Sequence, residues 1–126
     1  MLKATCLCNS VRFEIHETPS EPTACHCTQC RKQTGHFLAS ANVQKAAIKF
    51  LAAETLNWFQ SSEKVKRGFC AKCGSTLFWE PVFRDWTSVA LGCIEGLTGL
   101  SLERHIFVAE KGDYYVLADG LPQNER

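Results

Sequence analysis

Eight cysteines in a chain of 126 residues are the feature that most constrains this fold. Seven of them lie in three clusters and one stands alone: Cys6-Leu7-Cys8, Cys25-His26-Cys27-Thr28-Gln29-Cys30, Cys70-Ala71-Lys72-Cys73 and Cys93. Clustered cysteines are typically metal ligands or catalytic thiols in a reducing compartment, and disulfides in an oxidising one. The compartment therefore decides how these thiols are interpreted.

The sequence indicates a reducing compartment. Residues 1–6 show neither the apolar core nor the cleavage pattern of a signal peptide. No apolar run approaches the ~20 residues that span a membrane. We therefore expect a cytoplasmic protein without a membrane partner, whose seven clustered thiols bind metal. The even cysteine count leaves a disulfide framework as the alternative, although the thiols of a C-x-C pair are poorly spaced to bridge each other.

Composition indicates one ordinary globular domain. The hydrophobic fraction of 45% and the charged fraction of 21% are those of a folded domain with a core of its own. No linker or repeat divides the chain, so we predict a single domain over residues 1–126. The formal charge of +1 provides no excess basic field for a nucleic-acid partner.

Short segments of strand-like pattern dominate the chain. Residues 11–16 alternate apolar and polar side chains, and Pro19 and Pro22 then interrupt the pattern. Only residues 28–34 and 43–47 could form a helical turn or two. Closely spaced short strands predict a mainly β, antiparallel fold. The further strand candidates are residues 37–43, 48–52, 56–60, 64–69, 76–79, 87–91, 106–108 and 114–117.

The Cys70–Cys73 pair forms a C-x-x-C-G knuckle, in which two thiolates of a tight turn can face one ion. Gly74 supplies the positive φ that such a turn often needs. Zinc binds Cys sulfur tetrahedrally, so the knuckle provides half a site, and Cys6 and Cys8 are an obvious second half. Four thiolates would form a closed structural site.

The central cluster offers three sulfurs, those of Cys25, Cys27 and Cys30. Three protein ligands and one vacant position are the catalytic pattern for zinc, and a thiolate-rich ion favours a soft thiol substrate. Spacing alone does not decide which clusters combine. Cys93 or His26 could instead close the tetrahedron, giving two structural zincs and no chemistry.

The ordered motifs resemble the glutathione-dependent formaldehyde-activating enzyme family, which includes centromere protein V-like domains. The resemblance covers nearly the whole chain, and it is carried by Cys6-x-Cys8, Val11-Arg12-Phe13, the Cys25–Gly35 run, Ser61-Ser62, Arg67-x-Phe69-Cys70-x-x-Cys73-Gly74-Ser75, Leu91-Gly92, His105-Ile106 and Asp119-Gly120-Leu121-Pro122.

The resemblance implies a compact β fold shared with small zinc proteins that act on Rab GTPases, and two zinc ions per chain. It implies a structural zinc on the first four ligands and a second, catalytic zinc on the other three: Cys6, Cys8, Cys70 and Cys73, then Cys25, Cys27 and Cys30. The implied activity is that of a carbon–sulfur lyase which joins or separates glutathione and formaldehyde. A non-catalytic zinc module for a protein or thiol partner is the alternative.

The chain departs from the family pattern at three positions. Asn9 stands where Gly is common after the C-x-C pair, and since Asn also adopts positive φ we expect the turn to survive. Tyr115 stands where Trp is usual. Cys93 replaces a different small residue, and it would close the second site if it reached that ion.

Several polar residues flank the clusters. We predict that His26 hydrogen-bonds beside the metal and does not ligate it. His105 fits a hydrogen-bonded strand histidine at least as well as a substrate ligand. Arg31, Lys32 and Arg67 could hold the carboxylates of a glutathione-like tripeptide, but solvated surface cations are the interpretation that we prefer.

Overall fold

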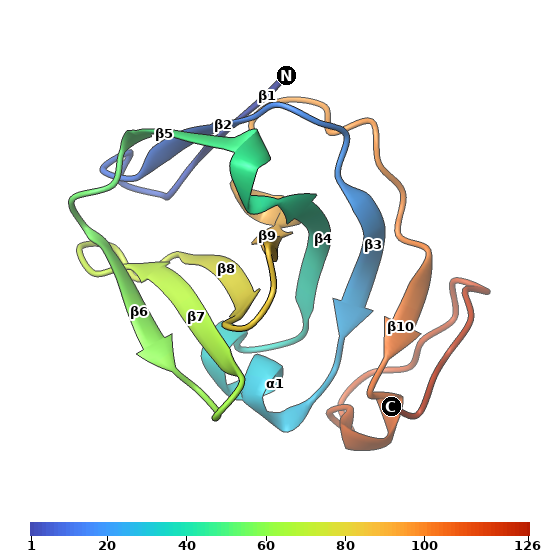
Figure 1. Cartoon of the computed structure of the whole chain (residues 1–126). Helices are drawn as coiled ribbons and strands as arrows, with labels where there is room; N and C mark the ends of the chain where they lie inside the picture. The colour runs from blue at the N-terminus through green and yellow to red at the C-terminus, as the bar shows by residue number, and fades with distance from the viewer.

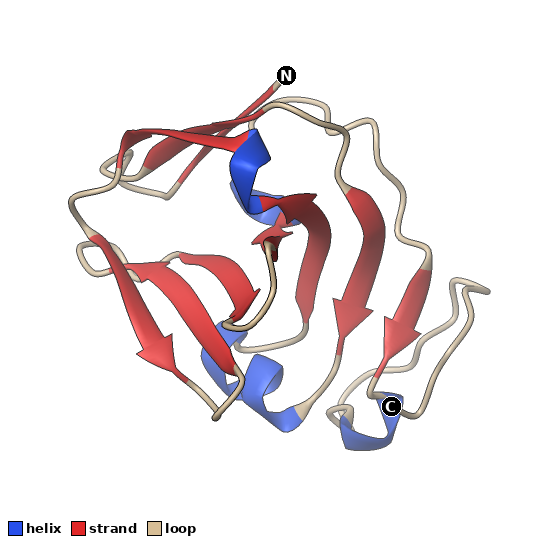
Figure 2. Ribbon diagram, viewed as in Figure 1, coloured by secondary structure: helices blue, strands red, loops and turns tan.

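The computed structural model describes residues 1–126 as two β-sheets and one short α-helix (Figures 1 and 2). The smaller sheet has the order β1 (Leu2–Thr5), β2 (Arg12–Ile15) and β5 (Ile48–Ala52). The larger sheet has the order β10 (Arg104–Ile106), β3 (Ser20–Cys25), β4 (Leu38–Gln44), β9 (Trp86–Ala90), β8 (Thr76–Pro81), β7 (Val65–Cys70) and β6 (Leu56–Gln60). The helical segments are α1 (Thr28–Thr34) and three 3₁₀ turns, η1 (Lys45–Ala47), η2 (Leu91–Cys93) and η3 (Val108–Glu110).

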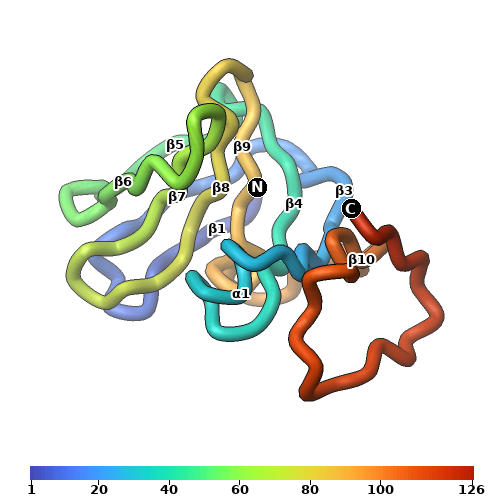
Figure 3. Tube along the Cα trace, turned by 90° about the horizontal axis from the view of Figure 1, so that it is seen from below, coloured from blue at the N-terminus to red at the C-terminus, as the bar shows by residue number.

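The larger sheet is strongly curved. In Figure 1 it runs from β10 on one side, through β9, to β6 on the other, while the smaller sheet lies across the top. Helix α1 joins β3 to β4 at the lower end of this sheet, and the chain after β10 extends beside it as a long loop (Figure 3). The curvature brings β3 and β7 around one shared space.

The main core lies between the two sheets. Phe13 of β2 packs against Phe78 of β8 with ring centroids 5.0 Å apart, and Val43 and Val89 complete the same buried cluster. Cys6 and Cys70 are also buried in this cluster. A second, smaller cluster contains Cys30, Leu38 and Ala90, with Cys25, Cys27 and Trp79 packed against it. Each core cluster thus adjoins one set of cysteines.

The predicted mainly β class is confirmed, and β5, β6 and α1 have the predicted bounds. Every strand pair is antiparallel except β10 with β3, which are parallel. Within residues 43–47, the expected helical turn is the 3₁₀ turn η1. No helix in the structure has both the length and the apolar character needed to cross a membrane.

Strand β3 was not among the predicted strands, and one predicted strand does not form. Strand β3 forms although Pro22 lies within it, because the pairing with β4 is irregular between Ser20 and Thr23, so the missing N–H of Pro22 is not needed there. Residues 114–117 form no strand. That segment is fixed by side chains instead: the hydroxyls of Tyr114 and Tyr115 hydrogen-bond histidines.

Candidate metal centres and the adjoining cleft

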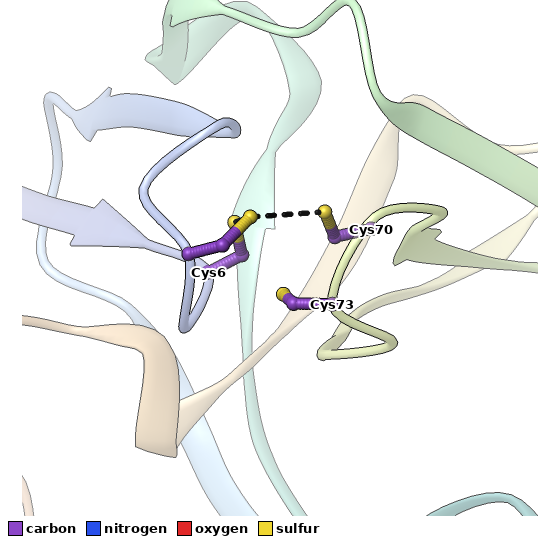
Figure 4. A group of neighbouring side chains, drawn as sticks. Cys6, Cys70 and Cys73 are labelled. Atoms are coloured by element: carbon purple, nitrogen blue, oxygen red, sulfur yellow. Dashed lines mark hydrogen bonds between the residues drawn. The ribbon is translucent and has the colours of Figure 1, made fainter.

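The four-thiol group consists of Cys6, Cys8, Cys70 and Cys73, whose sulfur atoms all lie within 4.8 Å of one another. Figure 4 shows the sulfurs converging from two turns that are far apart in the sequence. The Cys6–Cys8 and Cys8–Cys70 sulfur pairs are separated by 3.6 and 3.8 Å. A tetrahedron with zinc–sulfur bonds of about 2.3 Å has edges of about 3.8 Å. The four-thiol group therefore fits a tetrahedral metal ion.

The two turns are preorganised for thiolates. Asn9 and Gly74 both adopt positive φ, 66° and 81°, as expected from the sequence. The hydroxyls of Thr55 and Ser75 lie 3.3 Å from the Cys70 sulfur and 3.2 Å from the Cys73 sulfur. The Ser75 hydroxyl lowers the pKa of Cys73 to about 5, because it donates to the thiolate. These contacts favour the charged form that binds metal.

The three-thiol group consists of Cys25, Cys27 and Cys30, also within 4.8 Å of one another. Cys25 ends β3, and Cys27 caps α1, where its sulfur accepts the Cys30 N–H at 3.3 Å. Cys30 lies in the first turn of the helix. The strand end and the helix start thus direct three sulfurs to one point, with no fourth protein ligand beside them.

Negative charge on three neighbouring sulfurs needs a compensating cation. A hydrogen bond from Cys25 lowers the pKa of Cys27 to about 2, and the same contact raises the pKa of Cys25. Negative charge on one of these thiols therefore disfavours negative charge on its neighbour. Three thiolates together require a positive ion. A divalent metal ion with an affinity for sulfur fits this donor set.

Arg67 is the cation nearest to this group. It is 3% exposed, and its Nη1 lies 3.5 Å from the Cys30 sulfur. Two amide oxygens, those of Gln29 and Gln33 on α1, accept from the guanidinium at 3.2 and 2.9 Å. It forms no ion pair with a carboxylate. The preferred interpretation of Arg67 as a solvated surface cation is therefore wrong, because its charge is buried against sulfur.

Neither Cys93 nor His26 completes the three-thiol group. Cys93 packs against the main core, the cluster that contains Cys6. Its S–H donates to the Ala90 carbonyl at 3.0 Å. Burial raises the pKa of the Cys93 thiol to about 12. His26 is fully buried and has hydrogen bonds on both ring nitrogens, as predicted.

His26 belongs to a chain of four hydrogen-bonded side chains. Its Nε2 lies 2.9 Å from Nδ1 of His105, whose Nε2 lies 2.7 Å from the Asp119 carboxylate. Asp119 can only accept, so His105 donates to it and accepts from His26. His26 then accepts from the Tyr115 hydroxyl at Nδ1. Since His26 lies between Cys25 and Cys27, the chain fixes the backbone that carries two of the three sulfurs.

A cleft of about 690 Å³ opens at the three-thiol group. All three sulfur-bearing residues line it, together with Arg67. Its apolar lining residues are Leu38, Val65, Trp79, Trp86, Ile106 and Phe107, and the other lining residues are polar. A cleft of this size and mixed lining is typical of small-molecule sites. The four-thiol group, in contrast, shares no residue with the cleft.

Some residues of the cleft were predictable from the sequence and others were not. Of the three cations considered, only Arg67 lines the cleft; Arg31 and Lys32 do not. The period-two pattern of β7 could have located Arg67, because it places this residue on the same side as Val65, which also lines the cleft. Arg104 was not predicted, and its single position on a short strand carries no signal of its own.

The fold and these sites define a small β protein with two thiol groups able to hold metal ions, one of them at a cleft. A family model, described as glutathione-dependent formaldehyde-activating enzyme, matches residues 1–110. The chain therefore belongs to this family.

Two individual proteins are similar to the chain. An uncharacterized lyase of Schizosaccharomyces pombe is 23% identical, over 93% of this chain and 85% of its own. A crystal structure of a Rhodobacter sphaeroides protein superposes with a TM-score of 0.63 at 24% identity, covering 75% of this chain and 89% of its own, and it supports the fold. The family and the relative named a lyase support a lyase-like role linked to glutathione.

Proposed function

We propose that this protein is a zinc-dependent carbon–sulfur lyase-type enzyme. Its substrate would be the adduct of glutathione, or of a related thiol, with formaldehyde or another small aldehyde. The observation that carries the proposal is the three-thiol group, which lies at a cleft large enough for a tripeptide and lacks a fourth protein ligand. Membership of the family supports the same reaction class.

We propose zinc for both thiol groups, which gives two ions per chain. The four-thiol group would be the structural site, because its donor set is complete and it lies in the main core. The three-thiol group would be the catalytic site. Zinc bound by three thiolates keeps a coordination position for a fourth donor and favours a soft thiolate there.

The chain's own residues prepare this site for an anionic thiol. Arg67 contributes a buried positive charge beside Cys30, and the two glutamines of α1 hold it in place. Near Leu38 and Trp79, electrostatic interactions are stronger than in water, because apolar walls lower the local dielectric. In adduct formation the thiol sulfur bonds to the carbonyl carbon, and the carbonyl oxygen gains the proton that the thiol loses.

Exchange between glutathione, formaldehyde and their adduct, followed by NMR with zinc-loaded protein, tests this proposal. We expect the protein to accelerate exchange, and Cys27→Ser to abolish the acceleration. Cys93→Ser is the matched control, since Cys93 lies outside both thiol groups, and it should exchange at the wild-type rate. Exchange no faster than in buffer, or unchanged in Cys27→Ser, would remove the proposal.

Cobalt substitution separates the enzyme from a non-catalytic zinc module. An ion held by the three-thiol group should change its absorption spectrum when glutathione is added, because a further sulfur joins it. A module with two saturated sites should show no change. A spectrum insensitive to glutathione, together with no exchange, would favour the module.

A further inference from the structure

The cleft has a polar end on the concave side of the larger sheet. We define it by five residues that line the cleft and come from β3, β4, β9 and β10: Glu21, Ser40, Asn42, Ser88 and Arg104. Thr23 is the register partner of both Arg104 and Ser40, so these three residues form one row across the sheet. Cys25 lies two residues further along β3 toward the helix, on the same face of the sheet.

Two members of the polar end are available to a ligand. Neither the guanidinium of Arg104 nor the hydroxyl of Ser40 takes part in a side-chain hydrogen bond or ion pair within the protein. Both line the cleft, and Arg104 is half-buried. An arginine without a carboxylate partner is suited to bind a carboxylate through two parallel hydrogen bonds, and the free Ser40 hydroxyl lies across β3 from it in the same row.

Glu21 places a carboxylate at the same end. Its φ is 53°, an unfavourable conformation for a residue other than glycine. The side-chain amide of Asn42 donates to its Oε2 at 3.2 Å, and the Ser88 hydroxyl in turn donates to Oδ1 of Asn42. Strained backbone that is held by its surroundings is characteristic of functional sites. No ion pair links Glu21 to Arg104, so both charges remain free.

We propose that the polar end binds the zwitterionic amino-acid end of the thiol substrate, with its carboxylate on Arg104 and Ser40 and its ammonium on Glu21. This inference rests on the proposed function. In glutathione only the γ-glutamyl end carries both charges. Two residues along a strand span about 7 Å, so the row of Arg104 lies about that far beyond Cys25. A tripeptide thiol covers this separation, whereas a small thiol such as mercaptoethanol does not.

Binding measurements on the metal-loaded protein test the assignment of Arg104. Calorimetry would compare glutathione with cysteinylglycine, which lacks the γ-glutamyl group. We expect wild type to bind glutathione at least tenfold more tightly. Arg104→Gln should lose this preference and leave the affinity for cysteinylglycine unchanged. The matched control is Arg12→Gln, which removes an equal charge from an exposed position on the smaller sheet and should behave as wild type.

The ammonium contact has a test of its own. N-acetylglutathione lacks the positive charge, so we expect wild type to bind it several-fold more weakly than glutathione. Glu21→Gln should bind the two ligands equally well. If it keeps the wild-type preference, the ammonium site is wrong.

Two outcomes overturn the inference and leave the proposed function intact. In the first, wild type accelerates exchange equally with glutathione and with cysteinylglycine. In the second, Arg104→Gln lowers the affinity for glutathione and for cysteinylglycine by the same factor. If wild type neither binds a thiol nor accelerates exchange, the proposed function is contradicted. The proposed role of the polar end is then contradicted as well.

Discussion

The guanidinium of Arg67 lies 3.5 Å from the sulfur of Cys30, and both side chains are buried. A buried charge is costly unless an opposite charge lies close. Arg67 has only amide, hydroxyl and sulfur partners, so the thiolates are its counter-charge. The interaction is mutual. The arginine stabilises negative charge on the three-thiol group, and that negative charge offsets the cost of burying the arginine.

We therefore expect Arg67→Met to weaken the binding of glutathione to the metal-loaded protein by about tenfold or more. A unit charge about 6 Å from the incoming thiolate contributes about 2 to 3 kcal/mol at an effective dielectric of about 20. Titration of the cobalt-substituted protein with glutathione measures the loss, and thermal unfolding checks that the variant folds.

Lys66→Met is the matched control for this charge. Lys66 is the neighbour of Arg67 on β7, but it contacts Glu80 and the ring of Trp58, away from the sulfurs. It should bind glutathione as wild type does. Arg67→Lys should retain part of the affinity. Equal affinity in Arg67→Met and wild type would show that the guanidinium does not act on the ligand.

The contact between His26 and His105 predicts a cost in stability. In His105→Phe an aromatic ring is retained, but Nε2–H of His26 loses its partner in a fully buried position. An unsatisfied buried donor costs about 1 to 3 kcal/mol, so the free energy of unfolding should fall by that amount in urea denaturation. His16→Phe, at an exposed position, should change it by less than about 0.5 kcal/mol. Equal stability of the two variants would contradict the hydrogen-bonded chain.

Local sequence patterns predicted most elements of this fold. The short strand candidates at residues 48–52 and 56–60 match β5 and β6, and the helical turn considered for residues 28–34 is α1. Strand β3 was not predicted, because the pairing irregularity that accommodates Pro22 is a property of two strands together. The strand predicted at residues 114–117, a run of aromatic and aliphatic residues, does not form, because the two tyrosine hydroxyls bond histidines far along the chain.

The cysteine clusters could be identified from the sequence, but their spacing alone did not show which cysteines share a site. Spacing left open whether Cys93 joins the three-thiol group, and only the packing of η2 against the main core shows that it does not. The burial of Arg67 and the free guanidinium of Arg104 depend on the curvature of the larger sheet. Such relationships arise between strands that are distant in sequence, and no local pattern encodes them.

Removal of metal should affect the two thiol groups differently. The four-thiol group joins the β1–β2 turn to the β7–β8 turn within the main core, so its loss should abolish cooperative unfolding. We expect Cys70→Ser to be unfolded or to melt far below wild type. Cys25→Ser should lose one ion but stay folded, because the three-thiol group lies in the smaller cluster. Near-ultraviolet circular dichroism and metal analysis report both effects, and the reverse order of severity would contradict the assignment.

Gly68 on β7 gives a prediction that depends on packing alone. A Cβ built on this residue would lie 2.9 Å from the Trp58 ring and 3.0 Å from the Phe78 ring, and these two rings stack with centroids 5.7 Å apart. Overpacking of this kind typically costs about 1 to 3 kcal/mol, while replacing glycine in a strand returns about 0.5 to 1 kcal/mol by reducing the freedom of the unfolded chain. Gly68→Ala should therefore lower the free energy of unfolding by up to about 2.5 kcal/mol.

Gly92→Ala is the control for this substitution. Its Cβ would meet no atom within 4 Å, and Gly92 does not adopt positive φ. The control should unfold at the same urea concentration as wild type or slightly above it. Gly68→Ala should unfold at a lower urea concentration and should alter the fluorescence of Trp58. If Gly68→Ala were as stable as Gly92→Ala, the close packing of β6 on β7 and β8 would be wrong. The β6 edge of the larger sheet would then be less tightly packed than the structure shows.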